Sequence, residues 1–279
     1  MATLVTAFYP LEKSKHGVAK YLDWMRNFCQ IPRPMVLFTD AHTAPLLERL
    51  RRDVAADTRV IAKEFNTYRL TSPTWIEFWE RQWRVDPEAG IHNPSLYAVW
   101  AIKQECVTLA MEVNPFGHDW YVWCDIGIQR IPEVQSYYMT FPDQIQTICA
   151  PGRIHFLEVT QIPDAYVRVR GQVPTPLPPP SVSLGGGCIA GDRAAWTAFS
   201  MEYVTMLERF EERGWFAGKD QIVYFTMLME KVVPFRLFYA TSFGTPPPRD
   251  IHWMSFPVIL GGGAPARVDM RFEETGDSM

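Results

Sequence analysis

The residues best suited to chemistry stand at the end of a short apolar run in the middle of the chain. The run Trp120–Cys124 is aromatic, β-branched and apolar, which is typical of a buried strand, and Asp125 follows it directly. In open α/β sheets, ligands bind in the crevice outside the carboxyl ends of the strands. Asp125 is therefore the first candidate for contact with a ligand or metal, and Gly127 and Arg130 lie in the turn after it. The structural alternative is an aspartate that caps this turn.

Two further carboxylates stand at predicted helix starts. Residues 185–192 contain four glycines and end at Asp192, which is placed to cap a helix over 194–213. A glycine-rich loop that leads into a helix amino terminus is a geometry that can cradle a ligand. Asp220, followed by Gln221, begins another helix. There a carboxylate either complements the helix dipole or serves as a general base.

Cationic side chains supply the opposite charge. Lys103 lies close to the apolar stripe of a helix predicted over 95–113, so its ammonium either snorkels to the surface or points into a cleft. Lys13 belongs to a polar loop, 11–17, directly after the first predicted strand. In α/β folds this loop either contacts phosphate or simply faces solvent.

The element pattern of the first third predicts how these groups are positioned. Strands and helices alternate with short links, which favours a parallel sheet with right-handed crossovers, a nucleotide-binding type of half-domain. The strands are expected at 3–8, 35–38 and 58–62, and the helices at 18–28 and 46–54. No G-x-G-x-x-G and no P-loop motif is present, which disfavours a dinucleotide fold and excludes a P-loop enzyme.

The pattern of the remaining residues also predicts helices mixed with strands, in keeping with an α/β fold. Helices are expected at 73–84, 95–113, 194–213 and from 219, and strands at 120–125, 145–149, 154–159 and 237–240. A proline-rich extended connection is expected over 171–181. The tail after Gly263 becomes polar, so we expect it to be loosely held.

Composition narrows the class of protein. The chain has 279 residues, 47% of them hydrophobic, and a net charge of −4, so it can bury a large core and lacks the basic surplus of a nucleic-acid binder. Five cysteines form no C-x-x-C pair, which favours reduced thiols and a reducing compartment. The sequence shows no signal peptide pattern and no apolar run long enough to span a bilayer. We therefore expect a soluble, cytoplasmic protein that does not bind nucleic acid.

Several motifs together resemble one family. They are Thr3-Leu-Val-Thr-Ala-Phe-Tyr9 with Lys13-Ser14, the run Met35–Asp40, Leu96-Tyr-x-x-Trp-x-x-Lys103, Asn114-Pro-Phe116, Trp123-x-Asp125-x-Gly127 and Gly186-Gly-x-x-x-Gly191. Over most of residues 3–240 the chain resembles the HtrL/YibB family, which is found near bacterial surface-polysaccharide genes and in some large viruses. That family is similar in layout to the GT-A glycosyltransferases.

The resemblance implies one GT-A-like domain over 1–265, with a nucleotide-sugar half at 1–130, an acceptor half at 131–265 and a flexible tail at 266–279. It implies a nucleotide-diphosphate sugar as donor, with a UDP-sugar favoured and a GDP-sugar as the alternative, and a glycan or other hydroxyl as acceptor. Asp125 matches the first position of the D-x-D-type metal motif, whereas Gly127 replaces the second aspartate. We therefore expect Mn²⁺ or Mg²⁺ held by Asp125 with His252 and the phosphates. In the alternative, Lys103 and Arg130 neutralise the phosphates without metal.

The same resemblance assigns the remaining site residues. The acceptor wall would be formed by Gly186, Gly187 and Gly191 with Gln221. Asp220 matches the general base of inverting enzymes, with Asp192 as a second candidate, and a retaining reaction stays open. The donor would be bound by Thr6, Phe8, Tyr9, Lys13, Asp40, Lys103, Asp125, Gly127 and Arg130. Two other functions also remain open: a nucleotidyltransferase, and a catalytically inactive nucleotide- or glycan-binding protein.

Overall fold

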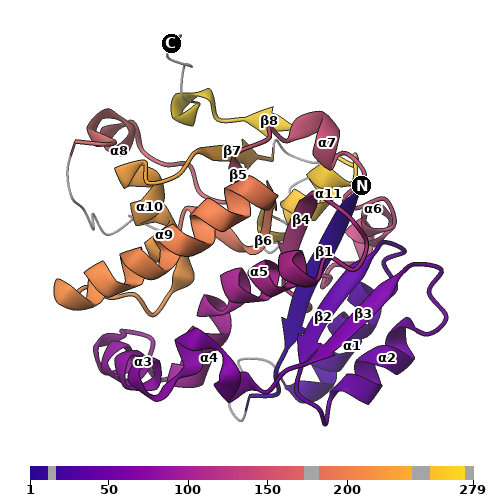
Figure 1. The fold of residues 1–279 in the computed structure, drawn as a ribbon. Coiled ribbons are helices and arrows are strands. Elements are labelled where there is room, and N and C mark those ends of the chain that lie inside the picture. Colours follow the sequence, from indigo (N-terminus) through magenta and orange to yellow (C-terminus); the bar gives the residue numbers. More distant parts are fainter. Residues whose placement is uncertain (12–16, 173–181, 241–251, 274–279) are drawn as a thin grey trace.

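A single mixed sheet of eight strands runs through the described part of the chain, in the order β3-β2-β1-β4-β6-β5-β7-β8 (Figure 1). The computed structural model of the protein describes residues 1–11, 17–172, 182–240 and 252–273. The strands are β1 (Ala2–Phe8), β2 (Met35–Thr39), β3 (Thr58–Ala62), β4 (Trp120–Cys124), β5 (Ile154–Glu158), β6 (Leu184–Asp192), β7 (Phe235–Tyr239) and β8 (Arg267–Val268).

The first half of the sheet confirms the predicted parallel unit. β1 pairs in parallel with β2 on one side and with β4 on the other, and β2 pairs in parallel with β3. The crossovers are the amphipathic helices α1 (Val18–Cys29) and α2 (Ala44–Arg51). Met25 and Phe28 of α1 are fully buried, as the helical spacing of its apolar residues predicts.

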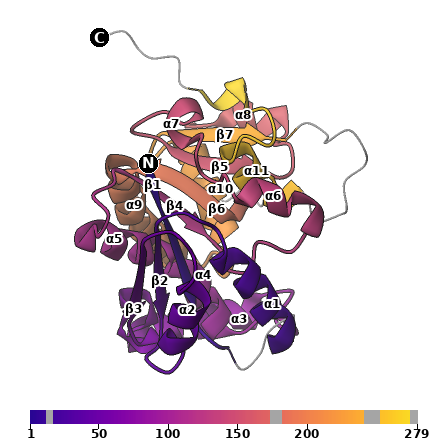
Figure 2. The same cartoon turned by 90° about the vertical axis from the view of Figure 1, so that its right-hand side faces the viewer.

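Helices cover both faces of the sheet, which confirms the predicted α/β class. α5, α9 and α10 pack on one face, and their core includes Val107, Phe199 and Leu228. α1, α6 and α11 lie on the other face. Figures 1 and 2 both place β2 and β3 with α1–α3 at one end of the molecule and β7, α7 and α8 at the other. The remaining helices are α3 (Pro73–Val85), α4 (Pro94–Ala101), α5 (Lys103–Val113), α6 (Gln135–Tyr138), α7 (Ile145–Ile148), α8 (Asp164–Val169), α9 (Arg193–Glu212), α10 (Asp220–Glu230) and α11 (Ser255–Leu260).

The predicted glycine-rich loop is instead a central strand. β6 runs antiparallel between β4 and β5: residues 188–192 pair with β4, and residues 184, 185, 189 and 190 pair with β5, with a register shift between Phe156 and Leu157. The loop prediction was wrong because glycines weaken intrinsic strand propensity, whereas here they accommodate neighbouring side chains. Gly191 shows this best, because a Cβ there would lie 3.0 Å from Ile154 and 3.2 Å from Trp196.

Three smaller predictions also need correction. Residues 145–148 form α7 rather than a strand. The helix expected over 95–113 is two helices, α4 and α5, which meet at Ile102. The chain also remains packed beyond 265, because β8 pairs with β7 and Phe272 is fully buried. Of the expected flexible tail, residues 274–279 lie outside the described residues, and the division of the domain at residue 130 stays a prediction.

The five cysteines are buried and free, as expected of reduced thiols. In the described ranges, none of the helices is both long and apolar enough to cross a membrane.

We expect acid to destabilise the protein through His155 on β5. Burial lowers the pKa of this imidazole from its ordinary 6.5 to about 3. Nε2 accepts a hydrogen bond from the Ala150 amide at 3.0 Å, so protonation would break this contact. The unfolded chain binds the proton more readily between pH 6.5 and 3, so the contribution of His155 is complete above pH 6.5 and declines as the pH falls. It should lose about 2 kcal/mol of unfolding free energy between pH 7.5 and 5.

Urea unfolding at the two pH values measures this loss. A His155→Gln variant should be less stable at pH 7.5 but show a shallower dependence on pH. An unchanged slope in the variant would contradict the assignment.

Candidate functional site

Asp125 lies where the strand order of the sheet changes direction. The chain leaves β1 for β2 on one side and later returns to β4 on the other, so the gap between the carboxyl ends of β1 and β4 is a switch point, a common position for ligands in α/β sheets. The parallel register pairs Val5 with Trp123, which puts Asp125 just beyond the end of β4. Its side chain is 37% exposed, so it can contact a ligand.

Behind Asp125 the structure places a buried ion pair. The Lys103 ammonium is 2.8 Å from Oδ2 of Asp220 and 3.4 Å from Oδ1 of Asp125. It also donates a 2.8 Å hydrogen bond to the carbonyl of Gly186. The side chains of Lys103 and Asp220 are only 4% and 5% exposed. Four of the predicted site residues are therefore in one contact network.

The carboxylates keep Lys103 charged despite its burial. Desolvation alone would lower the pKa of the ammonium, but Asp125 and Asp220 outweigh it and raise the pKa above its ordinary value. The break between α4 and α5 falls one residue before Lys103, so this lysine occupies the first turn of α5. The predicted cleft-facing lysine thus points at the sheet edge and does not snorkel.

Two glycines of β6 make room for these carboxylates. A Cβ at Gly186 would lie 3.0 Å from Oδ2 of Asp220, and one at Gly187 would lie 3.4 Å from Oδ2 of Asp125. The Asp125 amide also donates a 2.8 Å hydrogen bond to the carbonyl of Gly187. These glycines were predicted as an acceptor wall, and in the structure they line the carboxylate pair itself.

The turn after β4 presents Arg130 beside α1. Arg130 Nε donates to the carbonyl of Gly127 at 2.6 Å, and its guanidinium lies 4.4 Å from the ring centroid of Trp24. The two terminal nitrogens of Arg130 have no hydrogen-bond partner among the described residues, so they can bind an anion. A Cβ at Gly127 would lie 3.0 Å from the Tyr21 ring, which leaves little space for the second aspartate of a D-x-D motif.

Most of the remaining predicted donor residues are occupied within the fold. Asp40 accepts a hydrogen bond from the Thr43 amide at 2.7 Å, in the turn that leads into α2. The hydroxyl of Tyr9 donates to the Lys63 carbonyl at 2.9 Å, and burial raises the pKa of Tyr9. Phe8 is half-buried at the end of β1.

Thr6 differs from these residues. It is fully buried on β1, and its hydroxyl has no partner among the described residues. Lys13 lies outside the described residues.

Asp192 and Gly191 are at the wrong end of the sheet for the predicted roles. Asp192 pairs with Trp120, at the amino end of β4, about 13 Å along the strand from Cys124. Its carboxylate caps α9 through the Ala195 amide at 2.8 Å and accepts from the Gly152 amide at 2.7 Å. A second catalytic base at Asp192 and an acceptor contact at Gly191 are therefore corrected to structural roles.

His252 faces a different cavity on the same edge of the sheet. It begins the 3₁₀ helix η4 (His252–Met254) and is exposed. The cavity has a volume of about 440 Å³ and is also lined by Glu158, Tyr239 and Arg271. Asp125 and the Lys103–Asp220 pair are not among its lining residues.

A divalent metal at Asp125, as the resemblance implied, does not fit the residues found there. Oδ1 of Asp125 already accepts from the indole nitrogen of Trp123 at 2.8 Å and faces the Lys103 ammonium. A divalent ion on this carboxylate would also be repelled by the Lys103 ammonium, which lies 3.4 Å from Oδ1. Because Gly127 and Lys103 take the places of further oxygen ligands, Mg²⁺ or Mn²⁺ would have at most one ligand among the residues that the structure describes.

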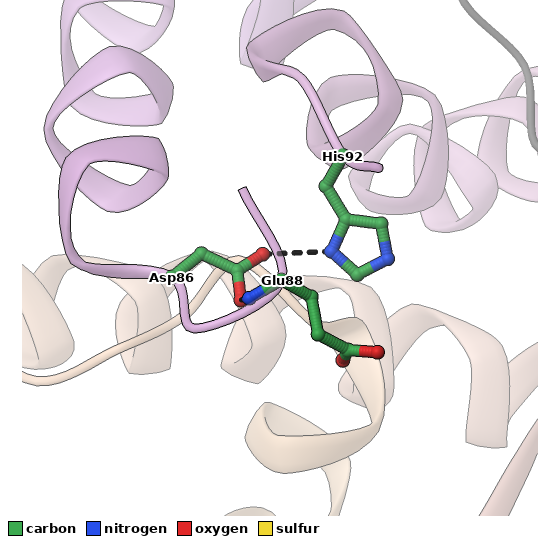
Figure 3. A group of neighbouring side chains, drawn as sticks. All are labelled: Asp86, Glu88 and His92. Carbon is green, nitrogen blue, oxygen red and sulfur yellow. Dashed lines mark hydrogen bonds and ion pairs between the residues drawn. The ribbon is translucent and has the colours of Figure 1, made fainter. Parts of the chain in front are cut away.

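One group of three potential metal ligands lies elsewhere in the described residues. Ligand atoms of Asp86, Glu88 and His92 all lie within 4.8 Å of one another (Figure 3). Asp86 Oδ2 accepts from His92 Nδ1 at 2.7 Å and from the Tyr97 hydroxyl at 2.5 Å, and Glu88 forms an ion pair with Lys219.

Burial would raise the pKa of Asp86, but these hydrogen bonds outweigh it and hold the pKa below its usual range. The group is thus satisfied without a metal. Through the ion pair of Glu88 with Lys219, the group also anchors the loop that leads into Asp220.

Aromatic residues that the sequence did not point to support the site. The Trp123 indole donates a hydrogen bond to Asp125, and the ring of Trp24 lies under the Arg130 guanidinium. The ring of Tyr21 packs against Gly127. Burial raises the pKa of Tyr21, while the charge of Arg130 opposes this rise. Trp123 could have been found, because alternate residues of a strand share one face and it precedes Asp125 by two positions. The contacts of α1 carry no such local signal.

No family model matches the chain, and no curated protein matches it. Among solved structures, the apo form of mouse xyloside xylosyltransferase 1 is 12% identical, with 84% of each chain covered and a TM-score of 0.45. The PaToxG glycosyltransferase is 9% identical, with 96% of this chain and 87% of that chain covered and a TM-score of 0.36.

A third structure is the 4-diphosphocytidyl-2C-methyl-D-erythritol synthase of Anaerococcus prevotii DSM 20548. It is 8% identical, with 92% of this chain and 96% of that chain covered and a TM-score of 0.33. Similarity at TM-scores below 0.5 does not establish a shared function. The assignments that follow therefore rest on the geometry of this chain.

Replacing Lys103 with methionine should strongly destabilise the protein. The change leaves the buried Asp220 carboxylate without its cation, and breaking a buried ion pair costs about 3–5 kcal/mol. Urea unfolding measures the loss, and Lys20→Met, at an exposed lysine, should change the stability little. Adding Asp220→Asn to Lys103→Met should recover part of the loss, since the unpaired charge is then removed. Lys103→Met with wild-type stability would contradict the buried pair.

Proposed function

We propose that the protein is a glycosyltransferase that moves a sugar from a nucleotide-diphosphate donor, UDP-linked rather than GDP-linked, to a hydroxyl acceptor. The resemblance to the HtrL/YibB family and to the GT-A layout gives the class of reaction and suggests surface polysaccharide or another glycan as the product. The donor would lie at the carboxyl ends of β1 and β4, in the nucleotide-binding half.

One observation carries the proposal: a half-exposed carboxylate at the switch point of the sheet, with one oxygen fixed from behind and the other open. Trp123 and Lys103 hold Oδ1 of Asp125, which leaves Oδ2 for a ligand. A fixed carboxylate oxygen is a good acceptor for the hydroxyls of a sugar or ribose. Arg130 supplies the matching group for phosphate, because its terminal nitrogens are free to form a bidentate contact.

The reaction needs these two groups at different atoms of the donor. The bond from the anomeric carbon to the diphosphate oxygen breaks and its electron pair leaves with the nucleoside diphosphate, so negative charge grows where Arg130 would bind. The acceptor oxygen forms the new bond to that carbon. Asp220, the predicted base, is 5% exposed and bound to Lys103, so we assign it a positioning role. The acceptor proton then passes to the departing diphosphate oxygen.

A nucleotidyltransferase would use the same half-domain, and an inactive binding protein would use the same crevice. The first would consume a nucleoside triphosphate and a sugar phosphate and release pyrophosphate. The second would bind the donor without hydrolysing or transferring its sugar. Assays of these products separate the three functions.

Titration calorimetry with UDP, UDP-sugars and GDP tests the proposed site. Asp125→Ala should weaken binding of the preferred donor about 10-fold or more, because a hydrogen bond to a charged group contributes about 1.5–3 kcal/mol. Arg130→Gln should weaken binding of the nucleoside diphosphate by a similar factor, because the variant lacks the guanidinium that would contact the phosphates.

The matched controls are exposed residues away from the crevice: Asp119→Asn, at the amino end of β4, and Arg84→Gln, on α3. Both should bind the donor like the wild type. Equal donor affinity in the wild type and in Asp125→Ala would refute the role of Asp125, and no binding of any nucleotide would refute the donor class.

A further inference from the structure

We propose that the Lys103 ammonium is a built-in cation that takes the place of a divalent metal, so that the donor binds and reacts without Mg²⁺ or Mn²⁺. The inference rests on the proposed function only for the identity of the ligand, a nucleotide-diphosphate sugar. Its geometric basis is the contact set of Lys103, Asp125 and Asp220.

All three N–H groups of the Lys103 ammonium have partners within the protein. Its three protons face three oxygens: the Gly186 carbonyl at 2.8 Å, Asp220 Oδ2 at 2.8 Å and Asp125 Oδ1 at 3.4 Å. The side chain is 4% exposed, so it does not reach a ligand in the crevice. Lys103 is therefore a positioning residue whose charge acts on the ligand through Asp125.

The two carboxylates would be the natural ligands of a metal at this edge of the sheet. Asp220 lies directly behind Gly186, where only the missing side chain lets it approach the strand, and it is paired with Lys103. Asp125 has Oδ1 occupied from the protein side. The charges of Asp125, Asp220 and Lys103 sum to −1, so one ammonium already removes half of the charge that a divalent ion would neutralise.

The position that could have restored a metal site is closed by packing. The second acidic place of a D-x-D motif is Gly127, and a Cβ there would stand 3.0 Å from the Tyr21 ring. Tyr21 forms an edge-to-face contact with Trp24, and the Arg130 guanidinium lies over the ring of Trp24. The two aromatic residues that leave no space for a side chain at position 127 therefore also hold Arg130 near the proposed donor. Arg130 would meet the diphosphate charge that a metal meets in a metal-dependent enzyme.

Two measurements on the wild-type protein test the inference. Donor affinity by calorimetry should change less than 2-fold between buffer with EDTA and buffer with Mn²⁺. In a Mn²⁺ titration followed by electron paramagnetic resonance, the wild type and Asp125→Asn should bind the same amount of Mn²⁺, because Asp125 holds no metal. Donor binding that weakens 10-fold or more in EDTA, or a Mn²⁺ site lost in Asp125→Asn, would overturn the inference.

Lys103 variants give a test in the opposite direction. In Lys103→Met the two carboxylates lose their cation, so the variant should gain a Mn²⁺ signal that the wild type lacks, and Mn²⁺ should raise its melting temperature. Lys103→Arg keeps the charge and should gain neither. Lys103→Met that folds without gaining Mn²⁺ binding would count against the inference.

If Lys103→Met does not fold, Lys103→Arg and the EDTA comparison decide the question. The Mn²⁺ titrations need no donor. Failure to bind any nucleotide would therefore refute the proposed function and leave the metal question to be answered separately.

Discussion

The buried charge of Lys103 is the constraint on which the rest of the site depends. An ammonium that is almost without solvent must have carboxylates and carbonyls around it, since a buried unpaired charge is far too costly for a domain of ordinary stability. Lys103 belongs to α5, and its three partners come from other parts of the fold: Asp220 from α10, Gly186 from β6 and Asp125 from the turn directly after β4. The Lys103 ammonium thus connects α5, α10, β6 and the end of β4 at the edge of the sheet where a ligand would bind.

Neighbouring features follow from this requirement. Gly186 and Gly187 have no side chains because the carboxylates occupy that space. The long helix is broken at Ile102, so that Lys103 starts a new helix at the sheet edge. The Asp86 network, through Glu88 and Lys219, holds the approach to α10, where Asp220 must be placed.

Prediction from the sequence was accurate where local pattern decides structure, because alternating helices and strands predicted the parallel half-sheet. Asp125, Lys103 and Asp220 were singled out from position and residue type; the structure brings both aspartates to Lys103, and their functional roles stay predictions. Prediction failed where long-range pairing decides. The glycines of β6 indicated a loop because their strand conformation depends on β4 and β5, neither adjacent in sequence. For the same reason Asp192 was assigned to the site although β6 carries it to the opposite edge. The partners of Lys103 are 22 and 117 residues away, beyond any local signal.

We propose that a nucleotide-sugar donor binds at the carboxyl ends of β1 and β4, next to Asp125 and Arg130. The most direct measurement is a nuclear magnetic resonance titration with UDP and a UDP-sugar, read on the indole N–H signals of the ten tryptophans. The signals of Trp123 and Trp24 should shift most, because Trp123 donates a hydrogen bond to Asp125 and Trp24 lies against the Arg130 guanidinium. The signal of Trp83, exposed at the end of α3, should not move. No shift of Trp123 and Trp24 at saturating nucleotide, or equal shifts of all ten signals, would contradict this position of the donor.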